Sequence, residues 1–307
     1  MPQIITFPFL ASINDAVSLA FNTQFSAADS RYKKFSFEGP STGAATIYPR
    51  LDLLPGMREW LGDRVVHALS VSVFQITNKT FENTISVQRP QLEDDLYGIL
   101  GPAAQQLGQT AGELPDLLIA SLMKNGHTSI TYDGQNFFDT AHPNPNADGS
   151  AGTIANYQAG SGSPWFLIDT RKTWRPFIYQ MRRPYQMIPK FSMTDPQVFW
   201  NQEFEWGVDG RSNAGYGLWQ TAFMSLGALS VANITAARTA MASIRRPNGT
   251  PMGIKPNLLV CGTSLYPDAL ALATNEFIPI DSNTGATTLG PNPLRGMFEA
   301  YEDEWLN

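Results

Sequence analysis

The sequence predicts an α+β protein in which an antiparallel sheet packs on one long helix and a smaller α/β lobe follows. Three patterns lead to this prediction. Apolar residues repeat with helical spacing over residues 91–125, aromatic strand-like segments follow over 164–226, and helix and strand patterns alternate after residue 227. A chain of 307 residues is long enough for one large core or two modest ones.

The N-terminal region contains one amphipathic helix, predicted over residues 10–28. Its apolar side chains recur every three or four residues, at Ile13, Val17, Ala20, Phe21 and Phe25. The following stretch, 32–51, holds only a turn between two short β-prone pieces, so no local segment is available to cover the helix. We therefore expect residues 1–50 to form an arm whose apolar face packs on another subunit.

Residues 51–90 contain a predicted β-hairpin. Apolar or aromatic side chains alternate over 64–76, a second β-prone run covers 81–87, and 77–80 is the expected turn. The alternating face of the first run consists of Val65, His67, Leu69, Val71 and Val73. A two-stranded hairpin is marginally stable alone in water. We expect this one to lie on a neighbouring subunit.

Residues 91–125 predict the long helix of the core. One side of it carries Leu107, Ala111, Leu114, Leu118 and Leu122. Pro102 suits a first helical turn, whereas Pro115 lacks an amide hydrogen and predicts a kink or break near residues 112–115. The Asn125-Gly126 pair predicts the end of the helix.

The region 126–226 supplies the sheet that should pack on this helix. A strand-like sequence pattern begins at Trp165 and Leu167 and continues at 177–179. The clearest strand is 200–208, where large apolar residues alternate with polar ones. Asp209-Gly210 is a typical hairpin turn, so the partner strand is predicted at 216–226. The predicted unit spans 91–226.

The last 81 residues predict an α/β lobe, 227–307. A helix is indicated by the spacing of Ile234, Ala237, Met241 and Ile244. It should be capped near Ser230 or Asn233 and should end at Pro247-Asn248-Gly249. Residues 258–261 predict a buried strand, and 267–274 predict a second helix.

Composition limits the function classes that fit this chain. Charged residues make up 16% of it, well below the roughly 25% usual for soluble domains, so much of the surface should contact protein. A net charge of −6 argues against a reader of nucleic acid, and contact with DNA should be weak and non-specific. The single cysteine, Cys261, excludes an intrachain disulfide. No signal peptide or run of about 18 apolar residues is present, and we expect no membrane association.

Two patterns could carry catalysis, and both have a simpler interpretation. Ser121 and Lys124 match the S-x-x-K spacing of penicillin-binding enzymes, but the accompanying S-D-N and K-T-G elements are missing. Residues of metal-ligand type gather at His127, Asp133, Asp139 and His142. Their spacing is wider than in ordinary metal sites, and we interpret them as surface turns. A hydrolase using Ser121, or a metal at His127 and His142, remains a remote alternative.

The other titratable clusters also have structural explanations. His67 lies within an apolar alternating face, which favours a satisfied core imidazole. Glu93, Asp94 and Asp95 are expected at a helix start, where the helix dipole favours negative charge. Arg182-Arg183 and Arg245-Arg246 could contact the genome, but acidic residues of neighbouring subunits are the favoured partners. We therefore predict no catalytic, cofactor-binding or metal-binding residue, no cofactor and no enzymatic activity.

Four segments, in order along the chain, resemble the major head subunit of Mu-like tailed bacteriophages, which belongs to the Hong Kong 97-type (HK97-like) capsid lineage. The first is ITNKTFENTISVQR at 76–89, continuing as EDDLYGI at 93–99. The second is YDGQNFFD at 132–139, followed by His142-Pro143. The third comprises PWFLID at 164–169, RPFIYQ at 175–180 and AGYGLWQ at 214–220. The fourth is GIKPNLLV at 253–260.

The resemblance implies an HK97-like fold with four parts. These are an N-terminal arm at 1–50, an extended E-loop hairpin at 51–90, a peripheral domain with the spine helix and sheet at 91–226, and an axial domain at 227–307. In the wider lineage the axial part more often precedes the aromatic peripheral strands. Here it follows them, an order that a circular permutation of the fold would produce.

The resemblance also implies the function of a major capsid protein. Such a subunit self-assembles into hexamers and pentamers that form the icosahedral head shell around phage double-stranded DNA. Its expected partners are copies of itself together with portal, scaffold and decoration proteins. Its expected location is the virion head, after assembly in the host bacterial cytoplasm. An HK97-type shell that encloses protein cargo, as encapsulins do, remains the closer alternative.

Overall fold

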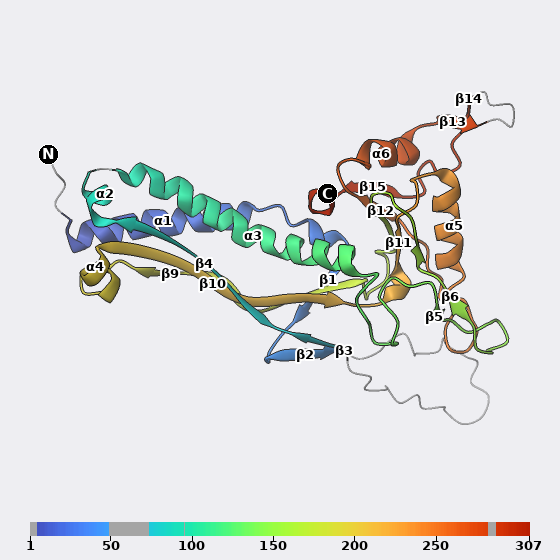
Figure 1. Cartoon of the computed structure of the whole chain (residues 1–307), viewed down its shortest axis with the longest axis horizontal. Coiled ribbons are helices and arrows are strands. Elements are labelled where there is room, and N and C mark those ends of the chain that lie inside the picture. Colours follow the sequence, from blue (N-terminus) through green and yellow to red (C-terminus); the bar gives the residue numbers. More distant parts are fainter. Residues whose placement is uncertain (1–4, 49–73, 95, 282–286) are drawn as a thin grey trace.

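Two mixed β-sheets organise the chain, one in an elongated body and the other in a compact lobe at its end (Figure 1). The computed structural model describes residues 5–48, 74–94, 96–281 and 287–307. The sheet of the body has the order β1 (Ser36–Pro40), β9 (Phe177–Lys190), β10 (Glu203–Tyr216) and β4 (Lys79–Gln88). The sheet of the lobe has the order β15 (Glu299–Glu302), β12 (Leu258–Cys261), β8 (Trp165–Ile168), β11 (Ala222–Ser225) and β7 (Tyr157–Gln158). The mixture of helices and sheets confirms the predicted α+β class.

Helices α1 (Phe7–Ala27) and α3 (Leu100–Asn125) lie side by side over one face of the body sheet (Figure 1). The apolar face of α1 is buried within its own chain, against α3 and against Phe204 and Trp206 of β10. The expectation that another subunit covers this face was therefore wrong. The covering helix lies more than 70 residues further along the chain, beyond the reach of any local pattern.

The two helices approach closely because α3 has glycine at the contact. A β-carbon added at Gly108 would overlap the carbonyl oxygen of Phe21, and one added at Gly112 would overlap the side chain of Ala28. The buried side of α3 continues through Pro115, Ile119 and Met123. This buried stripe is rotated around the helix axis from the predicted one. The prediction used the spacing of apolar side chains, and glycine has no side chain to contribute to it.

Helix α3 runs without a break through Pro115 to Asn125, followed by Gly126 as its C-cap. The end at Asn125-Gly126 is as predicted. Of the kink or break predicted near residues 112–115, the break is wrong, and the kink stays a prediction. Pro115 removes one backbone hydrogen bond. Its own side chain is buried, however, and packing along the 26 residues of α3 holds the helix together.

Strand β10 also differs from the sequence prediction. It continues straight through Asp209-Gly210 instead of turning there, and it pairs with β4 on one side and β9 on the other. The register against β9 shifts between Asp209 and Ser212, which is a β-bulge. Gly210 faces the ring of Tyr185, where a β-carbon would lie 2.6 Å from Cδ1. Glycine is thus needed for a close approach across the sheet and does not mark a turn.

The strands of the hairpin predicted over 64–87 also pair differently. Strand β3 (Phe74–Thr77) pairs with β2 (Ala45–Tyr48), whereas the next strand, β4, pairs with β10. Only Asn78 separates β3 from β4, so residues 77–80 form no hairpin turn. Most of the predicted first strand, including His67, lies outside the described residues.

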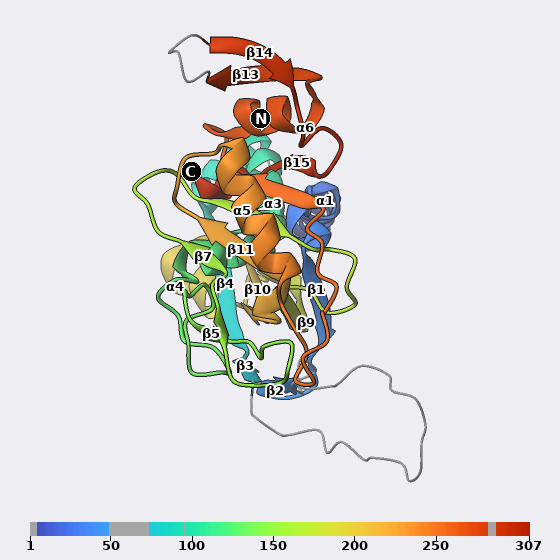
Figure 2. The ribbon, with the colours of Figure 1, turned by 90° about the vertical axis from the view of Figure 1, so that its right-hand side faces the viewer.

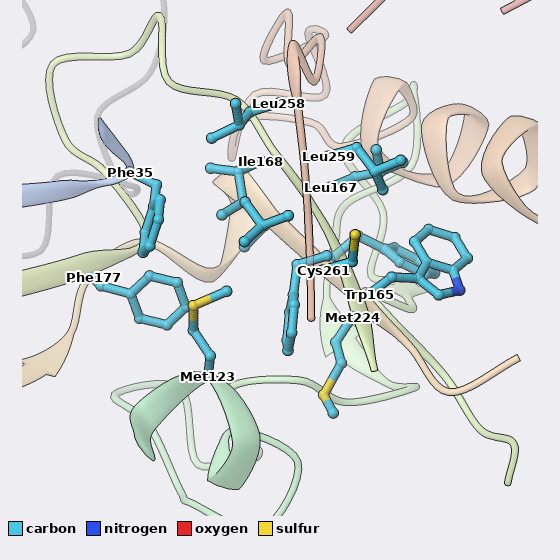
Figure 3. Packing of buried hydrophobic residues seen from close by; sticks show 14 of the residues in the cluster. Phe35, Met123, Trp165, Leu167, Ile168, Phe177, Met224, Leu258, Leu259 and Cys261 are labelled. Carbon is cyan, nitrogen blue, oxygen red and sulfur yellow. The ribbon is translucent and has the colours of Figure 1, made fainter. Parts of the chain in front are cut away.

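The compact lobe holds the largest hydrophobic core, which extends from Tyr32 to Leu306. Met123, at the end of α3, points into this cluster beside Phe177 (Figure 3). The predicted helices and strand of the C-terminal region are present as α5 (Val231–Ala242), β12 and α6 (Tyr266–Thr274). Ser230 caps α5 by accepting from the amide of Asn233 at 3.3 Å, but α5 ends before Pro247. Strands β7, β8 and β11 come from before residue 227, so the lobe is built from both sides of that position.

The remaining elements are short. They are η1 (Arg31–Lys34), α2 (Arg89–Glu93), η2 (Leu96–Ile99), β5 (His142–Pro143), β6 (Thr153–Ile154), α4 (Pro196–Asn201), η3 (Trp219–Thr221), β13 (Phe277–Asp281), β14 (Thr287–Pro291) and η4 (Glu304–Leu306). In the end-on view, α5 crosses in front of the lobe sheet and the β13–β14 ribbon lies beyond α6 (Figure 2).

A buried carboxylate ties α3 to the start of the body sheet. Asp116 Oδ1 accepts a hydrogen bond from the amide of Tyr32 at 2.6 Å, and only 4% of Asp116 is exposed. Burial raises the pKa of Asp116 to about 6, an effect that the hydrogen bond from Tyr32 opposes. The protonated form is thus the more stable one in the folded chain below that pH.

We expect Gly108→Ala to destabilise the folded chain by about 1–3 kcal/mol, because α1 must move away from α3 to make room for the methyl group. Gly101→Ala is the matched control, since a β-carbon there has no atom within 4 Å. Urea unfolding of the unassembled chain measures both variants. Equal stability of the two would show that the close contact between the helices does not limit the packing.

We expect the stability gained from Asp116→Asn to grow with pH. The side-chain amide introduced at position 116 still has an oxygen that can accept the hydrogen bond from the backbone of Tyr32, but it carries no charge. The pKa of Asp116 rises from 3.8 to about 6 on folding. The contribution of protonated Asp116 to the free energy of unfolding is therefore fully present below pH 3.8 and is lost as the pH rises through 6. Unfolding of both proteins between pH 4 and 7.5 should show the difference growing by up to about 3 kcal/mol. A difference that does not change with pH would contradict the burial of this charge.

Candidate functional site

The S-x-x-K pair does not form a catalytic arrangement. Ser121 is exposed on α3, and its hydroxyl accepts a hydrogen bond from the side chain of Asn125 at 3.4 Å. Lys124 Nζ instead donates to the backbone oxygen of Asn307 at 2.7 Å. The lysine therefore fastens the end of the described chain to α3 and is not directed at Ser121.

His142 and Asp133 are brought together, but in the interior. His142 Nδ1 lies 2.7 Å from Asp133 Oδ2, and the imidazole stacks on Trp219 with ring centroids 3.9 Å apart. His142 is fully buried and the Asp133 side chain is nearly so. The expectation of a surface position was wrong for His142, because Trp219, 77 residues away along the chain, covers its ring. Asp133 does show the predicted turn chemistry, since its Oδ1 accepts from the amide of Gln135 at 3.2 Å. A pair closed off in this way fixes the loop in place and offers no access to a substrate.

The other members of that cluster lie apart. The ring of His127 stacks on Tyr157, with centroids 5.9 Å apart. Asp139 accepts from the amide of Ala141 at 3.0 Å, which is the predicted turn chemistry. Within 5–48, 74–94, 96–281 and 287–307, no group of three or more His, Cys, Asp or Glu residues could hold a metal ion.

The charged clusters are used within the chain. Glu93 pairs with Arg89 at 2.8 Å, and Asp94 is the C-cap of α2. Glu93 is thus the last residue of α2 and Asp94 follows it, so the predicted helix-start explanation was wrong for both; Asp95 lies outside the described residues. Arg183 pairs with Asp209 of the adjacent strand, and Arg245 donates to the carbonyl of Gly249 at 2.7 Å. Arg183 and Arg245 thus have partners within the chain, and contacts of the two arginine pairs with a neighbour or with the genome stay a prediction.

Several large apolar side chains are exposed at the far end of the elongated body. We call this group the distal patch, and it consists of Phe7, Ile99, Phe199 and Trp200. They come from α1, η2 and α4, elements that meet at the end opposite the lobe (Figure 1). Trp200 is 77% exposed and Phe199 is 69% exposed, and their rings contact edge to face with centroids 4.9 Å apart.

Helix α4 explains why these two aromatic residues point into solvent. Pro196 begins the helix, and Gln202 ends it in the left-handed conformation, with φ of 56°. Val198 is the buried residue of this short helix, which leaves the next two positions outward. Trp200 was predicted to lie in a strand, and the distal patch was not predicted. The Asp195-Pro196 helix-start signal could have revealed it.

The arrangement therefore lacks converging reactive groups and instead exposes aromatic side chains at one extremity. Exposed apolar groups that cluster in this way favour a protein contact. Of the candidate reactive groups, His142 is buried and Lys124 is bonded to the backbone of Asn307. The site that fits this geometry is an interface.

Comparison with known proteins gives consistent matches along nearly the whole chain. A family model described as Mu-like prophage major head subunit gpT matches residues 10–306. The major capsid protein of Escherichia phage Mu is 34% identical over 285 residues, covering 91% of this chain and 92% of that protein. The Mu-like prophage FluMu major head subunit of Haemophilus influenzae is 35% identical over 263 residues, covering 83% and 85%.

Solved structures agree with the sequence matches. The procapsid of bacteriophage JBD30 matches with a TM-score of 0.80 and 36% identity, over 98% of this chain and 100% of that one. The JBD30 capsid matches with a TM-score of 0.77 and 26% identity, over 99% and 100%. The capsid fold expected from the resemblance is confirmed. The relatives are structural capsid proteins and not enzymes, and the chain belongs to the family of Mu-like prophage major head subunits.

Proposed function

We propose that copies of this chain assemble as hexamers and pentamers into the icosahedral shell of a phage head that encloses double-stranded DNA. The observation that carries this proposal is the match to the JBD30 procapsid, which spans 98% of this chain. The exposed aromatic residues of the distal patch support it, because they require a protein partner. A shell supplies the same partner surface to every copy.

The elongated body and the compact lobe fit the peripheral and axial parts of such a subunit. Residues 91–226 and 227–307 were assigned to these parts, and we propose that the lobe also includes β7, β8 and β11. The E-loop role of residues 51–90 stays a prediction, since 49–73 lie outside the described residues.

Several partners belong to this proposal. One JBD30 structure is a capsid decorated with minor capsid protein trimers, and we propose that a decoration protein binds this shell too. Portal and scaffold proteins, and assembly in the host cytoplasm, follow from the same function. Contact with packaged DNA should be weak, because the chain carries a net charge of −6. None of the helices in the described part of the chain is both long and apolar enough to cross a membrane.

We expect the chain, produced in bacteria with the other head proteins of its phage, to form closed shells. Negative-stain microscopy and sedimentation measure the particles, and nuclease treatment followed by extraction identifies their contents. Closed shells with protected DNA are the predicted result. Shells that hold protein cargo would favour the encapsulin-like alternative, and a chain that stays monomeric under all conditions would overturn the proposal.

The distal patch generates a second prediction. Trp200→Asp should leave the unassembled chain within about 0.5 kcal/mol of its normal stability, because the ring is largely exposed. In the shell, loss of a buried aromatic contact worth about 1.5–3 kcal/mol should raise the concentration needed for assembly about tenfold or more. Asn201→Asp is the control, since it adds the same charge to the same helix. Normal assembly of Trp200→Asp, or equal failure of both variants, would contradict a role for the patch.

A further inference from the structure

The β13–β14 ribbon presents a second apolar surface, at the opposite end of the molecule from the distal patch. Its two antiparallel strands pair Phe277 with Pro291 and Pro279 with Leu289. Directly opposed residues point to the same side of a ribbon, and so do alternate residues of one strand. These four side chains therefore form one face, which we call the ribbon face.

All four residues of the ribbon face are exposed. Leu289 is 75% exposed and Phe277 is 55% exposed, and both prolines are exposed as well. Ile278 points to the other side and is buried. The ribbon thus has its covered side toward the lobe and its apolar side away from it, and it lies beyond α6 in both views (Figures 1 and 2).

The base of the ribbon is fixed to the lobe. The amide of Asn292 donates to the carbonyl of Glu276, and its side chain donates to the carbonyls of Leu272 and Asn275, each at 2.9 Å. The amide of Gly296 donates to the carbonyl of Ala273, also at 2.9 Å. These bonds anchor the ribbon at the end of α6. The ribbon face is therefore held outward and does not fold back onto its own lobe.

The size and chemistry of the ribbon face indicate what covers it. None of the four residues carries a charge, so the face offers nothing to phosphate groups of DNA. A stable interface between two free proteins buries roughly 1,200 Å² or more in total, and four side chains supply only a fraction of that area. The face can contribute usefully only where other contacts already hold the partner. Copies of this chain in a shell meet that condition.

We propose that the ribbon face packs on a neighbouring copy of this chain in the assembled shell, an inference that rests on the proposed function. The contact is heterologous, since it joins the ribbon of one copy to a different surface of the next. It would bury Phe277 and Leu289 only after assembly. The unassembled chain keeps them in water.

A single introduced thiol tests this contact. The natural Cys261 is fully buried, and burial raises the pKa of its thiol to about 12, so it gives little background reaction. Leu289→Cys therefore carries one accessible thiol, on the ribbon face. Thr274→Cys, at the exposed end of α6 and outside the ribbon, is the comparison variant. The rate of maleimide labelling is measured for both, unassembled and in purified particles.

We expect the introduced thiol of Leu289→Cys to react about tenfold or more slowly in particles than in the unassembled chain. Failure of Leu289→Cys to form particles, with a folded monomer and normal assembly of Thr274→Cys, would equally support the contact. Particles of Leu289→Cys whose introduced thiol reacts at the unassembled rate would overturn it and leave the proposed function intact. If the natural chain forms no particles at all, the proposed function fails instead.

Discussion

The close contact between α1 and α3 is the interaction on which the elongated body depends. Gly108 and Gly112 let the two helices approach until backbone meets backbone, and together they cover one face of the long sheet. Strand β10 can then run for 14 residues with one side buried under these helices. Without α1, Phe204 and Trp206 would lose part of their cover. The N-terminal helix is thus part of the folded subunit.

The apolar residues of the molecule fall into two groups, those buried within the chain and those left exposed. Apolar residues near the middle of the body are used for folding, as Leu107 and Val208 are. Exposed aromatic residues remain at the far end of the body, and an apolar ribbon face remains on the lobe. The apolar residues of the body are therefore covered within the chain, and exposed apolar groups remain at both extremities. Its low content of charged residues, 16%, fits a chain that meets protein on several sides.

Local patterns in the sequence predicted the elements whose structure is locally determined. Strand β4, the Ser230 cap of α5, the buried strand β12 and helix α6 all lie where the pattern placed them. Long-range features were not predictable in this way. The partner of α1 lies more than 70 residues away, and the role of Gly210 depends on the ring of Tyr185 in the adjacent strand. Turn propensity alone cannot distinguish a glycine in a hairpin from one beneath an aromatic ring.

The surroundings of the candidate site residues were likewise not predictable from local patterns. Residue types alone suggested surface turns at His142 and Asp133, yet the ring of His142 is buried against Trp219 and the side chain of Asp133 is nearly buried beside it. The exposed residue Trp200 was assigned to a strand because it alternates with Phe204 and Trp206. The interruption by α4 breaks that alternation. The family resemblance identified the function correctly, and the structure was needed to locate the surfaces that carry it.

Hydrogen exchange of the unassembled subunit, followed by mass spectrometry, tests the central claim most directly. If α1 is part of the folded unit, amides of residues 10–27 should be protected to the same degree as those of α3 before any shell forms. The result that would contradict this account is α1 exchanging at the rate of an unstructured peptide while α3 stays protected. The helix would then be an arm that orders only on a neighbouring subunit.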